Sequence, residues 1–150
     1  MTDKKDKLFP AVVFDLDGCL FESKWRIHPI ALKILRLWEE KNIKIIILTA
    51  RWPLLRFYTR KRLNYYKIPI EKLIFWNHLW GTAWGFKYRQ IKQLMTEYKI
   101  IMAYDDHPRI CARYHQLGVP FTEVKELSYW EEIFETLQNQ LADNSNFLID

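Results

Sequence analysis

The chain has 150 residues, of which 49% are hydrophobic and 27% charged, and its formal net charge is +5. This composition is typical of a globular protein and excludes a low-complexity chain. The length is sufficient for one hydrophobic core, so we expect a single domain over residues 1–150, with a core at about 9–125, a C-terminal helix at about 127–141 and flexible tails. The basic balance is compatible with an anionic substrate or nucleic acid, and equally with ordinary solubility.

The sequence carries no marks of export or membrane insertion. Its two cysteines, Cys19 and Cys111, are too few for a disulfide framework. The charged N-terminus is not followed by the apolar run of a signal peptide, and the longest apolar runs, such as Ile45–Leu48, are too short to span a bilayer. We therefore expect a cytoplasmic protein without a membrane partner.

Strand and helix patterns alternate along the chain. Short apolar runs without alternation predict strands covered on both faces, and helical apolar spacing that follows a proline predicts helices. In chain order the predicted elements are a strand at Ala11–Phe14, a helix from Pro29 that ends at Lys41, a strand at Lys44–Leu48, a helix from Pro53 to about Tyr66, a weaker strand at Glu71–Trp76, a helix at Gly85–Tyr98, a strand at Ile100–Ala103, a helix at Pro108–Gln116, a weaker strand at Val119–Val124 and a helix at Leu127–Leu141.

This alternation predicts an α/β fold, a doubly wound (Rossmann-like), mostly parallel sheet with helices on both faces. In such sheets ligands bind beyond the carboxyl ends of the strands, near the point where the strand order reverses. We therefore expect the chemistry of this protein in the segments that directly follow the strands.

Polar side chains stand in those segments. Asp15-Leu16-Asp17-Gly18 follows the first strand, Thr49-Ala50-Arg51 follows the second, and Asp105-Asp106 follows Ile100–Ala103. Crowded carboxylates repel one another unless a cation neutralises them. An all-oxygen ligand set without a cysteine or histidine cluster favours Mg²⁺, which also binds a substrate phosphate oxygen.

The spacing of the first pair has a mechanical reason. Asp15 and Asp17 can both reach the cleft if the chain turns between them and the next helix, and Gly18 permits that turn. One carboxylate can attack phosphorus while the other handles the proton of the leaving group. Lys87, at the start of a predicted helix, can place a cation against the phosphoryl oxygens.

These segments resemble the four motifs of the haloacid dehalogenase superfamily of phosphotransferases. Val12–Leu20 (VVFDLDGCL) resembles the first motif, Leu48–Arg51 (LTAR) the second, Lys87 the third and Tyr104–Asp106 the acidic fourth. Order and spacing agree over about Ala11 to Val124, which is most of the chain. The resemblance implies a Mg²⁺-dependent phosphatase that acts through an aspartyl-phosphate intermediate.

The resemblance also implies a role for each matching residue. Asp15 matches the nucleophile and a metal ligand, and Asp17 matches the general acid and base, which binds the metal through its main-chain carbonyl. Thr49 and Lys87 match the pair that positions the phosphate. Asp106 matches the direct metal ligand of double-aspartate members, and Asp105 its support through water or Lys87.

Several assignments leave alternatives. Lys92 competes with Lys87 as the third-motif lysine, and we prefer Lys87 because of its distance from Asp105 along the chain. Arg51 is a surface arginine or a substrate contact, and His107 is a loop residue or a substrate contact. A cysteine-dependent phosphatase would need an arginine six residues after Cys19, where the chain has a tryptophan, so Cys19 is expected to be a small buried residue.

The substrate depends on what surrounds the site. Only about eight residues separate Leu20 from the helix at Pro29, so we expect no cap domain of the kind that encloses small substrates in many relatives. An open site suits a macromolecular phosphate. The helix after Arg51 interleaves basic and aromatic residues, which is typical of a single-strand binder, although an amphipathic helix with its aromatics turned inward has the same pattern.

Three functions therefore remain open. The motif pattern also resembles the 3′-phosphatase domain of polynucleotide kinases and RNA-repair phosphatase domains, which favours nucleic-acid ends or nucleotides as substrates. The sequence contains no kinase P-loop. In those domains an arginine directly follows the double aspartate, whereas this sequence has His107-Pro108-Arg109 there. The alternatives are a sugar-phosphate-type metabolite phosphatase closed by oligomerisation, with Trp76, Trp80 and Trp84 as a subunit contact, and a non-catalytic binding module. The sequence leaves the oligomeric state open.

Overall fold

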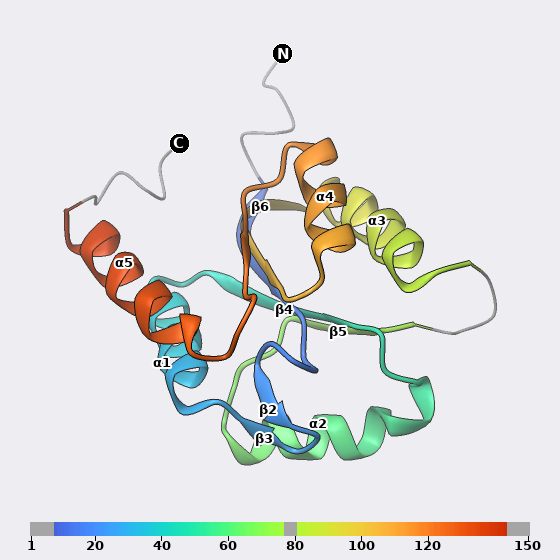
Figure 1. The fold of residues 1–150 in the computed structure, drawn as a ribbon, viewed down its shortest axis with the longest axis horizontal. Helices are drawn as coiled ribbons and strands as arrows, with labels where there is room; N and C mark the ends of the chain where they lie inside the picture. The colour runs from blue at the N-terminus through green and yellow to red at the C-terminus, as the bar shows by residue number, and fades with distance from the viewer. Residues whose placement is uncertain (1–7, 77–80, 144–150) are drawn as a thin grey trace.

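Five parallel strands form the central sheet of the computed structural model, which describes residues 8–76 and 81–143. The strand order is β5–β4–β1–β6–β7, so the first strand lies at the centre and the chain winds outward on both sides of it (Figure 1). The strands are β1 (Phe9–Phe14), β4 (Lys44–Thr49), β5 (Lys72–Phe75), β6 (Tyr98–Asp105) and β7 (Phe121–Glu123). The predicted doubly wound parallel sheet is confirmed.

Helices cover both faces of this sheet (Figure 1). Residues of β1 and β4 alternate between the two faces: Val12 and Phe14 pack in one apolar cluster, and Ala11 and Val13 in the other. The first cluster is completed by α1 and α5 with one residue of α2, and the second by α3 and α4. The helices are α1 (Pro29–Glu40), α2 (Arg56–Tyr65), α3 (Ala83–Leu94), α4 (Pro108–Leu117) and α5 (Tyr129–Asp143).

Several element boundaries differ from the prediction, among them those of α3 and β6. The helix expected at Gly85–Tyr98 begins at Ala83, where the Thr82 hydroxyl accepts a hydrogen bond from the Gly85 amide at 3.1 Å, and ends at Leu94. Strand β6 starts earlier than expected because Tyr98 pairs with Phe9 of β1, and this long-range pairing overrides the helical apolar spacing.

A short antiparallel hairpin, β2 (Phe21–Ser23) and β3 (Arg26–Ile27), occupies the stretch between the first motif and α1. The sequence pattern did not predict it because strands of two or three residues carry no periodicity. A hairpin in this position is far smaller than a cap domain, in agreement with the expected capless fold.

The helix after Arg51 differs from the amphipathic alternative. A 3₁₀ turn at Pro53–Leu55 precedes α2, and the buried side of α2 consists of Thr59 and Leu63. The aromatic side chains instead face solvent: Phe57 is 71% exposed and Tyr65 is 69% exposed. The alternative with the aromatics of this helix turned inward is therefore wrong for these residues.

The C-terminal helix is anchored beneath the first motif. The Trp130 ring is fully buried, lies 5.6 Å from the Tyr104 ring, and donates a hydrogen bond from Nε1 to the Cys19 carbonyl at 2.9 Å. Tyr104 in turn stacks on Phe14. Within the described residues, no helix is both long and apolar enough to cross a bilayer.

Replacement of Trp130 should therefore destabilise the whole fold. Trp130→Ala leaves a large cavity and an unpaired Cys19 carbonyl, and we expect it to lower the free energy of unfolding by about 3–5 kcal/mol. Urea denaturation measures this loss. The neighbouring Tyr129, which is 37% exposed, provides the control: Tyr129→Ala should cost less than about 1 kcal/mol, and an equal loss in both variants would contradict the anchoring role.

Candidate active site

The motif residues converge at the carboxyl edge of the sheet, where β1 lies between β4 and β6. Asp15 directly follows β1 and its amide donates to the Tyr104 carbonyl of β6 at 3.0 Å. Thr49 ends β4, and Asp105 ends β6. This is the point where the strand order reverses, as expected for a ligand site in a doubly wound sheet.

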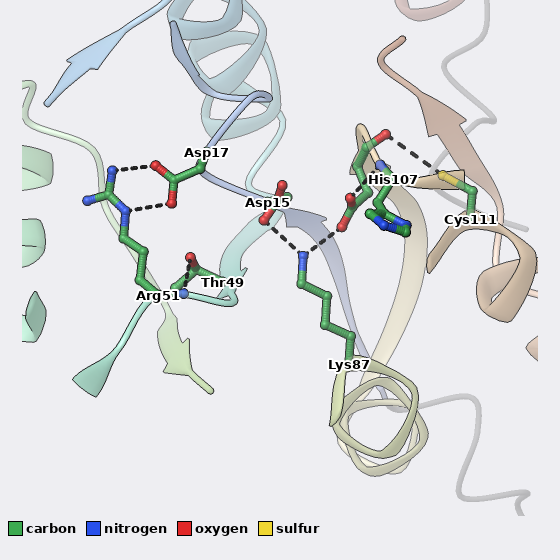
Figure 2. Close-up of polar contacts among 8 residues, drawn as sticks. Asp15, Asp17, Thr49, Arg51, Lys87, His107 and Cys111 are labelled. Atoms are coloured by element: carbon green, nitrogen blue, oxygen red, sulfur yellow. Dashed lines mark hydrogen bonds and ion pairs between the residues drawn. The ribbon is translucent and has the colours of Figure 1, made fainter. Parts of the chain in front are cut away.

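A buried lysine joins two of the carboxylates (Figure 2). Lys87, in α3, donates from Nζ to Asp15 Oδ1 at 2.8 Å and to Asp105 Oδ2 at 2.7 Å. Burial disfavours the Lys87 ammonium, but Asp15 and Asp105 outweigh this cost and raise the pKa of Lys87. The lysine is therefore a permanent cation in the site. Lys92 is exposed and lies over the Tyr88 ring, so the structure brings Lys87 and not Lys92 to the motif.

The acidic group carries more negative charge than Lys87 can balance. Asp15, Asp105 and Asp106 each offer an oxygen, and these oxygens lie within 4.8 Å of one another. Burial, together with the neighbouring carboxylates, raises the pKa of Asp15 well above its ordinary value, and burial followed by Asp105 raises the pKa of Asp106. Three carboxylate oxygens at this spacing form the donor set of a hard divalent cation, so the residues present suit Mg²⁺.

Gly18 allows the fourth motif to approach the first. Its φ of 72° lies in the left-handed region, and a Cβ at this position would lie 2.5 Å from Asp106 Oδ2. The turn predicted at Gly18 is therefore observed, and a side chain there would displace the Asp106 carboxylate.

Asp17 does not point into the acidic group. Figure 2 shows its carboxylate directed toward Arg51, on the other side of the loop from the contact between Asp15 and Lys87. Arg51 donates to it twice, from Nε to Oδ2 at 2.8 Å and from Nη2 to Oδ1 at 2.7 Å. The Asp17 side chain is 56% exposed, whereas that of Arg51 is 3% exposed. This planar, bidentate pairing orients Asp17 while leaving it room to turn.

Arg51 is therefore not a surface arginine. It could contact a substrate only by giving up some of its present hydrogen bonds. Its guanidinium donates to the Thr59 hydroxyl at 3.1 Å and to the Lys24 carbonyl. It also lies over the rings of Phe21 and Trp25, at 4.9 Å and 5.0 Å from their centroids. Sequence reasoning missed these partners because they come from the unpredicted hairpin and from α2.

Thr49 and His107 lie at the same edge. Thr49 is buried, and its hydroxyl accepts a hydrogen bond from the Arg51 amide at 3.1 Å. The His107 amide donates to Asp105 Oδ1 at 3.0 Å, so both oxygens of Asp105 have partners. The His107 ring caps α4 by accepting from the Arg109 amide and stacks on Trp84. His107 therefore touches the site through its backbone.

Two other sequence predictions concern residues near the site. Cys19 is fully buried as expected, and burial raises the pKa of its thiol well above the ordinary value, which disfavours a thiolate nucleophile. Of the three tryptophans considered as a subunit contact, Trp80 lies outside the described residues. Trp76 and Trp84 are partly buried, and Arg109 lies over the Trp84 ring.

The raised pKa values of Asp15 and Asp106 predict a dependence of stability on pH and Mg²⁺. Without metal, the folded state holds these protons more tightly than the unfolded state, so stability should fall as pH rises from about 4 through the raised pKa values. Asp106→Asn removes part of this repulsion. We expect the variant to have a higher Tm than the wild type at pH 8 in EDTA, and to gain less Tm on addition of Mg²⁺.

Thermal unfolding followed by circular dichroism checks this prediction. Glu40→Gln, an exposed site at the end of α1, is the control and should leave the Mg²⁺ effect unchanged. An equal Mg²⁺ gain in the wild type and in Asp106→Asn would remove Asp106 from the metal site.

Comparison with known proteins gives one family match and several structural matches. The family model described as "PITM 1-3, LNS2 domain" matches residues 12–126, which is more than half of the chain. Among curated proteins, no sequence shows significant similarity.

The structural matches are at low sequence identity. A chain of the Pnkp1/Rnl/Hen1 RNA repair complex superimposes with a TM-score of 0.71 at 20% identity, over 81% of this chain and 44% of that one. The HAD domain of effector protein Lem4 from Legionella pneumophila, an inactive mutant, gives 0.58 at 14% identity, over 87% and 94%. The core domain of a candidate phosphoglycolate phosphatase from Streptococcus pneumoniae TIGR4 gives 0.53 at 16% identity, over 87% and 98%. These likenesses show the haloacid dehalogenase fold; this chain spans less than half of the RNA repair protein.

Proposed function

Because the chain belongs to the PITM 1-3 LNS2 domain family and has the haloacid dehalogenase fold, we propose that it is a phosphomonoester hydrolase that forms an aspartyl-phosphate on Asp15. The observation that carries this proposal is the cluster of Asp15, Asp105 and Asp106 at the carboxyl edge of the sheet, in which the buried Lys87 ammonium contacts Asp15 and Asp105. A cluster of three carboxylates with one buried lysine holds uncompensated negative charge, which is costly in a fold and typical of a functional site.

The donor set suits Mg²⁺ as the cofactor. Asp15 and Asp106, with the main-chain carbonyl of Asp17, would hold the ion, and Asp105 would support it through Lys87. When bound, Mg²⁺ supplies the positive charge that neutralises the carboxylates and a substrate phosphate oxygen.

The residues of the chain divide the chemistry between them. A carboxylate oxygen of Asp15 attacks phosphorus, the bond from phosphorus to the leaving oxygen breaks, and that oxygen takes a proton from Asp17. In the second step a water molecule attacks the phosphorus of the aspartyl-phosphate, gives its proton to Asp17, and releases Asp15 and phosphate. In this scheme Thr49 and Lys87, which are both buried at the same edge of the sheet, would donate hydrogen bonds to the phosphoryl oxygens.

Arg51 is a positioning residue in this scheme. It holds the Asp17 side chain by two hydrogen bonds, in the orientation seen in Figure 2. To reach a leaving oxygen, Asp17 must turn from Arg51 toward Asp15, and its exposed side chain has room to do so. The contact with the buried Arg51 guanidinium is then the starting position from which the Asp17 side chain turns.

We propose nucleic-acid ends or nucleotides as the substrate class. Two features support it: the site carries a two-strand hairpin in place of a cap, and residues 51–67 beside it contain six Arg or Lys residues and no acid. The structural likeness to a chain of an RNA repair complex also supports this substrate class. A small metabolite phosphatase closed by a second subunit is the alternative function, favoured by the same open site.

Turnover of p-nitrophenyl phosphate under Mg²⁺ tests the reaction. Asp15→Asn should abolish it, because an amide cannot form the phospho-intermediate, and Asp17→Asn should lose most of kcat while it still binds Mg²⁺. Lys92→Ala, outside the site, is the control and should keep wild-type turnover. A folded wild type without Mg²⁺-dependent turnover of any phosphomonoester would instead support the non-catalytic alternative.

The role of Arg51 is tested by a split between kcat and KM. Arg51→Lys keeps the charge but loses the bidentate contact, so we expect kcat to fall roughly tenfold with little change in KM. In the Asp17→Asn background the same substitution should have almost no further effect, because Arg51 acts through Asp17. A rise in KM that persists in the double variant would show that Arg51 contacts substrate directly.

A further inference from the structure

A ring-lined cleft lies beside the proposed active site. It is formed by Trp25 of the β2–β3 hairpin together with Tyr58, Lys61, Arg62 and Tyr65 of α2, and its volume is about 350 Å³. Tyr58 is 60% exposed and Tyr65 69%, so two aromatic faces are open to solvent within one concave surface. This volume lies in the range of small-ligand sites.

The cleft is held in shape by contacts across the fold. Arg62 donates to the Trp25 carbonyl, and Arg51 donates to the neighbouring Lys24 carbonyl, so two arginines fix the hairpin tip against α2. The Trp25 and Tyr58 rings meet edge to face at 6.3 Å. The aromatic walls are thus preorganised, which lowers the entropic cost of binding a flat ligand.

The charge of the cleft favours an anionic ligand. Lys61 and Arg62 belong to its lining, and the Arg62 guanidinium lies 4.7 Å from the centroid of the Tyr65 ring. No Asp or Glu occurs between Arg51 and Lys67. Rings for stacking combined with cations for a phosphodiester backbone are the features that bind single-stranded nucleic acid.

The cleft is also connected to the catalytic residues. Trp25 forms a wall of the cleft, and its ring lies 5.0 Å from the guanidinium of Arg51, which holds Asp17. One side chain therefore separates the cleft from the proposed proton donor. A base in the cleft and a phosphate at Asp15 can belong to neighbouring parts of one strand.

We propose that this cleft binds a nucleobase of a single-stranded nucleic acid whose terminal phosphate enters the site at Asp15. The proposal rests on the proposed function and identifies the residues that recognise its substrate. An anionic membrane would also attract the basic surface, but the cleft residues surround a hollow, whereas Leu54, which at 82% is the most exposed large apolar side chain among the described residues, lies outside it. The variant Leu54→Ala can therefore distinguish binding of a nucleic acid from binding of a membrane.

Fluorescence anisotropy with two labelled oligonucleotides tests the proposal. Both strands have the same length and charge and no terminal phosphate, but one carries abasic sites at its three 3′-terminal positions. We expect the wild type to bind the complete strand roughly five- to a hundredfold more tightly, on the scale of one or two base–aromatic stacks. Tyr65→Ala and Tyr58→Ala should reduce this preference. Both side chains are exposed, so the variants should fold, and circular dichroism checks this.

Controls separate stacking from charge. Leu54→Ala and Lys99→Gln should leave the base preference unchanged. Lys99 lies near the start of β6, at the end of the strand away from Asp105. Lys61→Gln should weaken the binding of both strands and lower the slope of log affinity against log salt by about 1.

Two outcomes would overturn the proposal. One is equal affinity for the complete and abasic strands. The other is binding to phosphatidylserine–phosphatidylcholine vesicles that is lost in Leu54→Ala and accompanied by no base preference, which would assign the surface to a membrane. Turnover of p-nitrophenyl phosphate in the same preparations distinguishes the two proposals: retained turnover without base preference refutes the cleft alone, whereas base preference without turnover refutes the hydrolase and supports the cleft.

Discussion

The contact of one buried ammonium with two carboxylates is the interaction on which the site depends. Lys87 lies 2.8 Å from Asp15 and 2.7 Å from Asp105, and all three side chains are buried. A lone charge in this place would be strongly destabilising, so each of the three requires the others. The contact also ties α3 to the ends of β1 and β6, which are the elements that a phosphate would have to meet.

Lys87 does not balance all of the carboxylates at this edge of the sheet. Asp106 adds a third carboxylate, and burial together with the neighbouring Asp105 raises the pKa of both Asp15 and Asp106. Under the proposed function, a divalent cation at this edge would relieve the repulsion between these carboxylates, so stability without the cation would be lower in exchange for activity. Gly18 makes the close approach of Asp106 possible, because any Cβ there would displace the Asp106 carboxylate.

The two aspartates of the first motif contact different cations. Asp15 faces Lys87, whereas Asp17 faces Arg51, and the Arg51 guanidinium also holds the hairpin tip and α2. The same arginine thus links the proposed proton donor to the aromatic and basic surface beside the site. Arg51 orients Asp17 and, together with Arg62, holds the hairpin tip that forms one side of the Trp25 cleft.

Local sequence patterns predict the sheet, the order of the motifs and the placement of Asp15, Thr49 and the double aspartate after strands, because apolar strands followed by polar residues are local signals. The choice of Lys87 follows instead from the resemblance to the third motif. The sequence did not determine the start of β6, the hairpin or the outward aromatics of α2. These depend on the pairing of Tyr98 with Phe9 and on contacts of Arg51 and Arg62 with a distant hairpin. The contact between Arg51 and Asp17 is visible only in the folded chain. The two residues lie 34 positions apart in the sequence, and no local pattern predicts that they meet.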